Sequence, residues 1–135
     1  MANRTFYPCY SYGIGRVYLE ARFTCNGASA PATSTIDGSD SISTLAHTGA
    51  TNIITIGFKD SFYKVISASA DFVVSAVAGN YAQVGGFTNE GTATPLVMTV
   101  TTWVAAGTVL NDAANTYQVG ITLALKNTQT VAGIK

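Results

Sequence analysis

The stretch that decides the fold runs from residue 17 to residue 25 and reads Val-Tyr-Leu-Glu-Ala-Arg-Phe-Thr-Cys. Its apolar residues occupy every second position, and the alternate positions hold Tyr18, Glu20, Arg22 and Thr24. A period of two is the repeat of a β-strand, in which successive side chains point to opposite faces. The stretch therefore predicts a strand with one buried face and one solvated face.

Similar runs of β-forming residues recur along the chain. We expect further strands at residues 42–47, 52–58, 66–77, 81–87, 96–104 and 117–126, with a short edge strand at 33–36. Turn-forming pairs follow two of the strands, at Asn26-Gly27 and at Gly79-Asn80. Residues 60–64 break the alternation, which indicates one short helical turn or a tight connection. No amphipathic helix longer than a turn or two is expected.

Two of these strands show which side chains should face the core. The last strand places its apolar positions on one face: Tyr117, Val119, Ile121, Leu123 and Leu125. The longest strand does the same with Ile66, Ala68, Ala70, Phe72, Val74 and Ala76. About eight short strands, each with an apolar face, are typical of two packed sheets. We therefore predict an all-β fold, a single β-sandwich domain of jelly-roll-like type.

The composition agrees with strand-and-turn structure in one domain. The chain has 135 residues and a mass of 14.0 kDa, the size of one domain. Hydrophobic residues make up 47% and charged residues 10%, against about 25% charged in ordinary globular domains. We expect an extended N-terminal arm at residues 1–15, the sandwich at 16–128 and a C-terminal tail at 129–135. A surface so poor in charge favours association with other proteins.

The charge pattern argues against several kinds of partner. Lys and Arg number 7, Asp and Glu number 7, and the bases are spread singly along the sequence. This spacing predicts no concentrated positive field, so we expect no nucleic-acid partner. No apolar run is long enough to span a bilayer, and residues 1–8 lack a signal-peptide pattern. We therefore expect no membrane partner, and either synthesis in a cytoplasm or a mature chain.

The residues that catalysis or metal binding requires are scarce. His47 is the only histidine, and Cys9 and Cys25 match no metal or redox spacing. The cysteines are expected as small core residues, with a bridge between them as the alternative. Asp37 and Asp40 lack the spacing of a calcium loop and indicate a plain Asp-Gly turn. With no nucleophile motif either, we expect no catalytic residue, cofactor, metal or small-molecule substrate, and hence no enzyme.

Aromatic residues are concentrated near the N-terminus, and they are candidate interface residues: Phe6, Tyr7, Tyr10 and Tyr12. Such side chains combine a large apolar area with a polar tip, so an arm that carries them can anchor on a neighbouring protein. The alternative is that they cover the edge of their own sandwich. Trp103 is the fifth candidate, and its strongly apolar surroundings place it in the core or in an interface.

Two stretches after residue 50 carry a pattern seen in a known family. Residues 55–68 read Thr-Ile-Gly-Phe-Lys-Asp-Ser-Phe-Tyr-Lys-Val-Ile-Ser-Ala, and residues 122–128 read Thr-Leu-Ala-Leu-Lys-Asn-Thr. They resemble small structural proteins of tailed bacteriophages, the capsid decoration or cement proteins. In that group a strand ends in an Asp-aromatic turn, a Ser/Ala-rich strand follows, and the last strand reads apolar-x-apolar-basic-Asn-Ser/Thr. The first 50 residues match nothing in it, and Gly49 is an imperfect counterpart of its usual glycine.

The resemblance implies a jelly-roll-like domain that decorates or cements the outside of a phage capsid and has no catalytic residues. Its implied partners are further copies of the chain, as a homotrimer, and the major capsid protein. Its implied location is the capsid surface of a virion, after synthesis in the host bacterial cytoplasm. The alternative function is a receptor- or carbohydrate-binding module of a tail fibre or spike, in which Trp103 would serve as a sugar platform.

Overall fold

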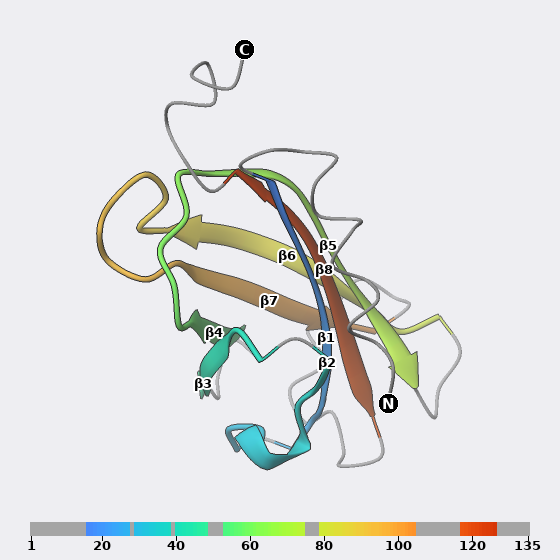
Figure 1. Ribbon diagram of the computed structural model, residues 1–135. Helices are drawn as coiled ribbons and strands as arrows, with labels where there is room; N and C mark the ends of the chain where they lie inside the picture. The colour runs from blue at the N-terminus through green and yellow to red at the C-terminus, as the bar shows by residue number, and fades with distance from the viewer. Residues whose placement is uncertain are drawn as a thin grey trace, which may run out of the picture.

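The computed structural model describes residues 16–27, 29–38, 40–48, 53–74, 79–104 and 117–126 (Figure 1). The strands are β1 (Arg16–Thr24), β2 (Asp37–Gly38), β3 (Ile42–Thr48), β4 (Ile53–Phe58), β5 (Lys64–Val74), β6 (Tyr81–Thr88), β7 (Val97–Trp103) and β8 (Gln118–Lys126). Within these ranges the 3-10 turn η2 (Thr33–Thr35) is the only helical element. The prediction of an all-β fold is confirmed.

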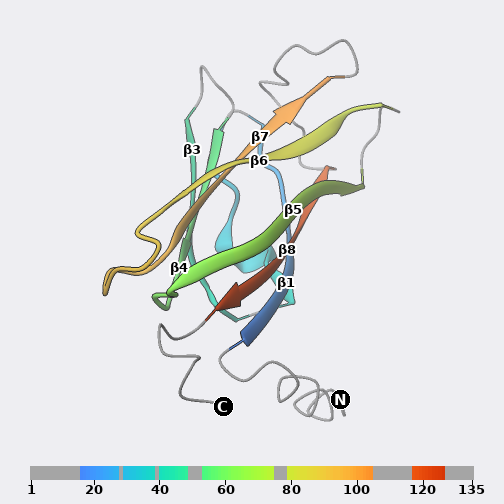
Figure 2. The same ribbon diagram turned by 90° about the horizontal axis from the view of Figure 1, so that it is seen from above.

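The strands form two antiparallel sheets that pack face to face. One four-stranded sheet has the order β2-β1-β8-β5, and the other has the order β3-β4-β7-β6. Figure 2 shows β1, β8 and β5 on one side of the molecule and β3, β4, β7 and β6 on the other. The chain changes sheet between β2 and β3, β4 and β5, β5 and β6, and β7 and β8. This arrangement is a β-sandwich, as the sequence predicts.

The core lies between the two sheets and takes alternate residues from their strands. Its largest fully buried members come from both sheets: Phe23, Val119, Leu123 and Leu125 from one, and Ile54, Ile56, Met98 and Val100 from the other. Fully burying one such side chain is worth roughly 1.5–3 kcal/mol. The interlocking of the two apolar faces is therefore what holds the sheets together.

The predicted inner faces of β1 and β8 are confirmed. Leu19 lies opposite Leu123 and Phe23 lies opposite Val119, and all four side chains are buried. Strand β8 is central, since it pairs with β1 on one side and β5 on the other. The turn predicted after β1 is also present, because Gly27 has a φ of 59° and closes the chain back toward β2.

The predicted inner face of β5 is only partly right. Three of its positions pack against the core as expected: Ala68, Ala70 and Phe72. Ile66, however, is 42% exposed, because the register of β5 against β8 shifts at this residue and again at Val73. Each shift is a bulge that adds one residue to β5 and resets the alternation of its side chains. The predicted inward directions of Val74 and Ala76 lie outside what the structure describes.

The edge strand predicted at residues 33–36 is wrong. Residues 33–35 form η2, and the short edge strand β2 follows at Asp37–Gly38. Local hydrogen bonds favour the turn: the Thr35 hydroxyl donates to the Ala32 carbonyl (2.7 Å) and accepts from the Thr24 N–H (3.1 Å). The break predicted at residues 60–64 is a tight connection without a helical turn.

The free edges of both sheets are poorly suited to pairing with another chain. Strand β5 has two bulges, and β3 and β6 have one register shift each. The remaining edge strand, β2, has only 2 residues. Bulges and very short strands oppose the addition of a further strand at an edge. Association with another protein is therefore expected through the outer faces or the ends of the sandwich.

Candidate functional site: the outer faces of the sandwich

The outer face of the β3-β4-β7-β6 sheet carries no Asp, Glu, Lys, Arg or His among its described residues. The register and the burial of alternate positions place on this face Thr44, Ala46, Thr48, Ile53, Thr55, Gly57, Tyr81, Gln83, Thr88, Val97, Thr99, Thr101 and Trp103. Threonine predominates, and two aromatic side chains lie at one end. We call this surface the uncharged face.

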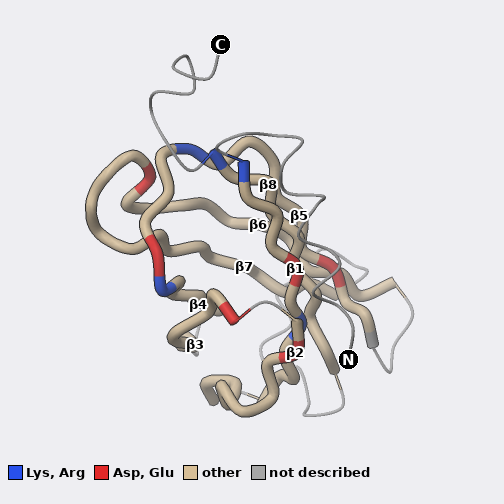
Figure 3. Tube along the Cα trace, in the orientation of Figure 1, with Lys and Arg blue, Asp and Glu red and all other residues tan. Residues whose placement is uncertain are grey.

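The outer face of the β2-β1-β8-β5 sheet, the charged face, holds every charged residue of the described strands. They are Arg16, Glu20, Arg22, Asp37, Lys64, Asp71 and Lys126. In Figure 3 the tube along β6 and β7 is free of charge colours, whereas charges mark the opposite sheet. Arg22 and Asp37 form an ion pair at 3.7 Å, but both side chains are exposed, so the pair stabilises little. The two outer faces therefore differ strongly in their affinity for water.

Trp103 is half-buried at the end of the uncharged face and stacks on Tyr81. The two residues are register partners on β7 and β6, their ring centroids are 6.3 Å apart, and their planes differ by 16°. Tyr81 is 41% exposed, so the stacked pair presents aromatic surface to solvent. The indole Nε1 is buried and has no hydrogen-bond partner within the described ranges. Trp103 thus lies at the surface of a sheet and not in the core between the sheets.

The other four candidate interface residues lie outside the described part of the chain: Phe6, Tyr7, Tyr10 and Tyr12. The same holds for Cys9, for the arm predicted at residues 1–15 and for the tail predicted at 129–135. Of the five candidates from the sequence, the structure therefore places only Trp103.

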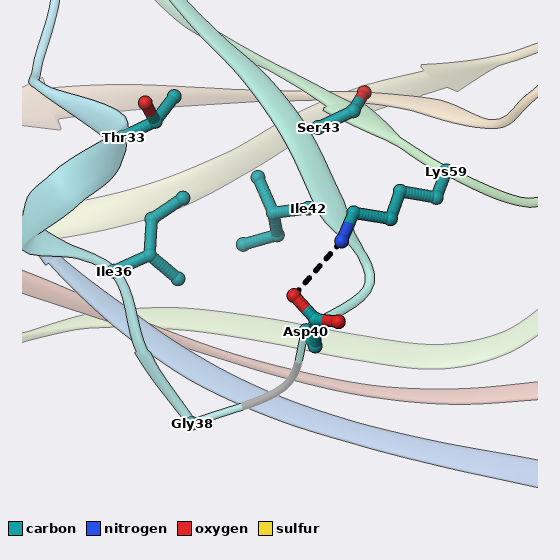
Figure 4. Close-up of a pocket in the computed structure, with 7 residues that line it drawn as sticks. All are labelled: Thr33, Ile36, Gly38, Asp40, Ile42, Ser43 and Lys59. Carbon is teal, nitrogen blue, oxygen red and sulfur yellow. Dashed lines mark hydrogen bonds and ion pairs between the residues drawn. The ribbon is translucent and has the colours of Figure 1, made fainter.

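A groove of about 440 Å³ lies between η2, β2 and the start of β3 (Figure 4). Its lining consists of Thr33, Ile36, Gly38, Asp40, Ile42, Ser43 and Lys59. The two charged groups of the groove are bonded to each other, since Lys59 Nζ lies 2.8 Å from Asp40 Oδ1. Small-molecule sites combine an apolar pocket with several convergent polar groups. The lining of this groove does not combine these features, so we regard the groove as a depression of the surface and not as a ligand site.

The groups that serve most often as nucleophile, base or metal ligand are few among the described residues. Cys25 is 3% exposed, and burial raises the pKa of its thiol to about 11, so the thiol is protonated at neutral pH. His47 is half-buried on β3 and takes part in a hydrogen bond or a similar polar or ring contact. Within the described ranges no three potential metal ligands come together, and no helix has the length and apolarity to cross a membrane.

Three bases that are distant in the sequence meet at one end of the charged face. Arg16 of β1 lies opposite Lys126 of β8, and Lys126 lies opposite Lys64 of β5. Figure 3 shows these blue segments together where β1 and β5 begin and β8 ends. We call the three residues the basic row. The fold brings these bases together although they are dispersed in the sequence, because linear spacing does not give the register between strands.

The comparisons with known proteins add no relative from which a function could be transferred. No family model, no curated protein and no solved structure matches the chain. What this protein does is therefore inferred from its own residues and geometry.

Proposed function

We propose that this protein is a structural virion protein that binds the outside of a bacteriophage capsid and reinforces or decorates it through protein–protein contacts. The observation that carries the proposal is the uncharged face. Interface cores are depleted in charged residues and enriched in aromatic ones. A sheet face with threonines, Ile53, Val97 and the Tyr81–Trp103 pair has that composition, while the opposite face keeps the charges that suit contact with water.

The remaining features of the chain are consistent with this role. The bulged and short edge strands oppose open-ended strand addition, which would compete with assembly on a capsid. The resemblance of residues 55–68 and 122–128 to capsid decoration proteins supplies the particular partner, the major capsid protein. It also supplies the proposed homotrimer, the jelly-roll type of the sandwich and the location on the surface of a virion made in a bacterial cytoplasm. No catalytic role is proposed.

The direct test is co-sedimentation of the purified protein with capsids assembled from the major capsid protein of the phage that encodes it. We expect saturable pelleting with the capsids at a fixed ratio of copies to capsid protein. Protein that stays in the supernatant at all concentrations would contradict the proposal. Deletion of residues 1–15 tests the arm: if the aromatic arm is the anchor, the truncated chain remains folded by circular dichroism but no longer pellets.

A second candidate function rests on the stacked Tyr81–Trp103 pair. Aromatic faces exposed on a β-scaffold form platforms for sugar rings, and the pair lies at the end of a face rich in hydroxyl groups. This geometry favours a carbohydrate- or receptor-binding module of a tail fibre or spike. Binding on a glycan array that Trp103→Ala abolishes, while Thr122→Ala on the opposite sheet leaves it intact, would support this function over capsid decoration.

A further inference from the structure

We propose that the basic row, Arg16, Lys126 and Lys64, is a docking surface for an acidic segment of a partner protein. The three residues share the outer side of three adjacent strands in direct register. Opposite Cβ atoms in antiparallel pairs are about 4.5–5.5 Å apart, so the row spans roughly 10 Å. This is about one Debye length at 0.1 M salt, so the three charges act together on a ligand.

The described surroundings leave the row largely unneutralised. The ion pairs within the described ranges join Arg22 to Asp37 and Lys59 to Asp40, and neither pair involves the row. One carboxylate approaches the start of β5: Glu90 Oε1 accepts a hydrogen bond from the Val65 N–H at 2.7 Å. The sequence segments that adjoin the row, residues 1–15 and 127–135, contain no Asp or Glu.

The three neighbouring positive charges lower the stability of the free protein and favour the binding of a ligand with carboxylates. Like charges directly opposite each other destabilise a sheet, and this cost is relieved when carboxylates bind between them. The central base is also held in position. Lys126 Nζ lies 5.4 Å from the centroid of the Tyr63 ring, and the Lys126 carbonyl accepts the Tyr63 N–H at 2.9 Å. An ordered cation loses less conformational entropy on binding.

The charges around the row favour an acidic protein segment over a nucleic acid. A duplex lays many phosphates along a broad basic surface. Here the charged face continues from the row into Glu20 of β1 and Asp71 of β5, which would repel phosphates laid across it. The exposed Tyr18, on β1 two residues after Arg16, adds the aromatic surface typical of protein interfaces. A short segment with a few Asp or Glu residues fits the row alone.

The test is binding of a short fluorescein-labelled oligoglutamate peptide, measured by anisotropy at low salt and at about 0.15 M salt. The double variant Lys64→Glu/Lys126→Glu is compared with Arg22→Glu/Lys59→Glu, which changes the net charge equally at bases outside the row. We expect the first variant to lose affinity at least about tenfold, which is within the range of close charge pairs at interfaces. We expect the second variant to lose less than about threefold. Circular dichroism checks that both variants fold.

Three results would overturn the proposal. The wild-type protein could fail to bind the peptide, or the two double variants could lose affinity equally, which would show an effect of net charge alone. A duplex DNA of the same charge could bind more tightly than the peptide and respond to the same variants, which would make the row a site for nucleic acid. If the first variant does not fold, Lys64→Gln and Lys59→Gln give the same contrast at smaller amplitude. None of these results depends on a capsid, so they are separate from the test of the proposed function.

Discussion

At the scale of single residues, Cys25 makes the stability of the fold depend on pH in the alkaline range. Burial raises the pKa of its thiol from an ordinary 9.0 to about 11. The folded protein therefore keeps the thiol proton to higher pH than the unfolded chain does. The stability that follows is complete below pH 9.0 and is lost as the pH rises toward about 11. A shift of this size corresponds to about 2–3 kcal/mol at most.

The prediction compares the wild-type protein with Cys25→Ala by urea unfolding between pH 8 and pH 11. The variant loses about 1 kcal/mol at pH 8 because the sulfur no longer packs against the core, but its stability falls less steeply above pH 9. Comparing the two proteins removes the common contribution of tyrosine and lysine titration. Parallel pH profiles for the two proteins would contradict the assignment.

Gly38 is held in a conformation and a space that other residues do not fit. Its φ is 109°, and a Cβ at this position would lie 2.5 Å from the Glu20 carbonyl oxygen. We expect Gly38→Ala to lower the free energy of unfolding by about 1–3 kcal/mol through strain and loss of the β1–β2 pairing. Gly86→Ala is the control, because a Cβ there meets nothing within 4 Å. Equal denaturation midpoints for the two variants would show that β2 does not constrain Gly38.

At the scale of elements, β8 is the central strand on which the charged sheet depends. Leu123 is fully buried opposite Leu19, whereas its neighbour Thr122 is exposed on the outer side of the same strand. We expect Leu123→Ala to cost about 2–5 kcal/mol and Thr122→Ala less than about 0.5 kcal/mol, as measured by urea unfolding. Similar losses for both variants would mean that the sides of β8 are assigned wrongly.

The strands differ in how far the sequence predicts them. In β1 and β8 the alternation of inward and outward positions is unbroken. The period alone therefore identifies the buried side chains, such as Leu19 and Leu125. In β5 the apolar period continues through Ile66, but bulges reset the side chains, and bulges follow from pairing with β8 and not from the sequence of β5 alone. Residues 33–36 fail for a different reason: the hydrogen bonds of Thr35 stabilise a turn where β-formers suggest a strand.

The candidate site was predictable to a smaller extent than the fold. Composition indicates a surface poor in charge, and the sequence predicts Trp103 as a core or interface residue. The sorting of charges onto one sheet and the basic row depend on register and on which strands share a sheet. Both are set by contacts between residues far apart in the sequence, such as Arg16 with Lys126, and local periodicity does not contain them.

At the scale of the whole molecule, the two outer faces have different tasks in this account. The charged face keeps its contact with water except at the basic row at one end, where we propose that an acidic segment docks. Under the proposed function, the uncharged face is the one that a partner protein covers. Thr55 lies near the middle of the uncharged face, between Ala46 and Thr99, and Thr122 lies near the middle of the charged face, between Glu20 and Ser69. Both are threonines on central strands, so the same substitution can be made on either face.

The measurement that tests the central claim most directly is the fraction of protein that co-sediments with capsids for Thr55→Lys and for Thr122→Lys. A lysine in the middle of a covered face must lose its water on binding, which costs several kcal/mol. We expect at least about a tenfold loss of capsid affinity for Thr55→Lys and binding close to wild type for Thr122→Lys. Wild-type binding by Thr55→Lys, or an equal loss by both variants, would contradict the account.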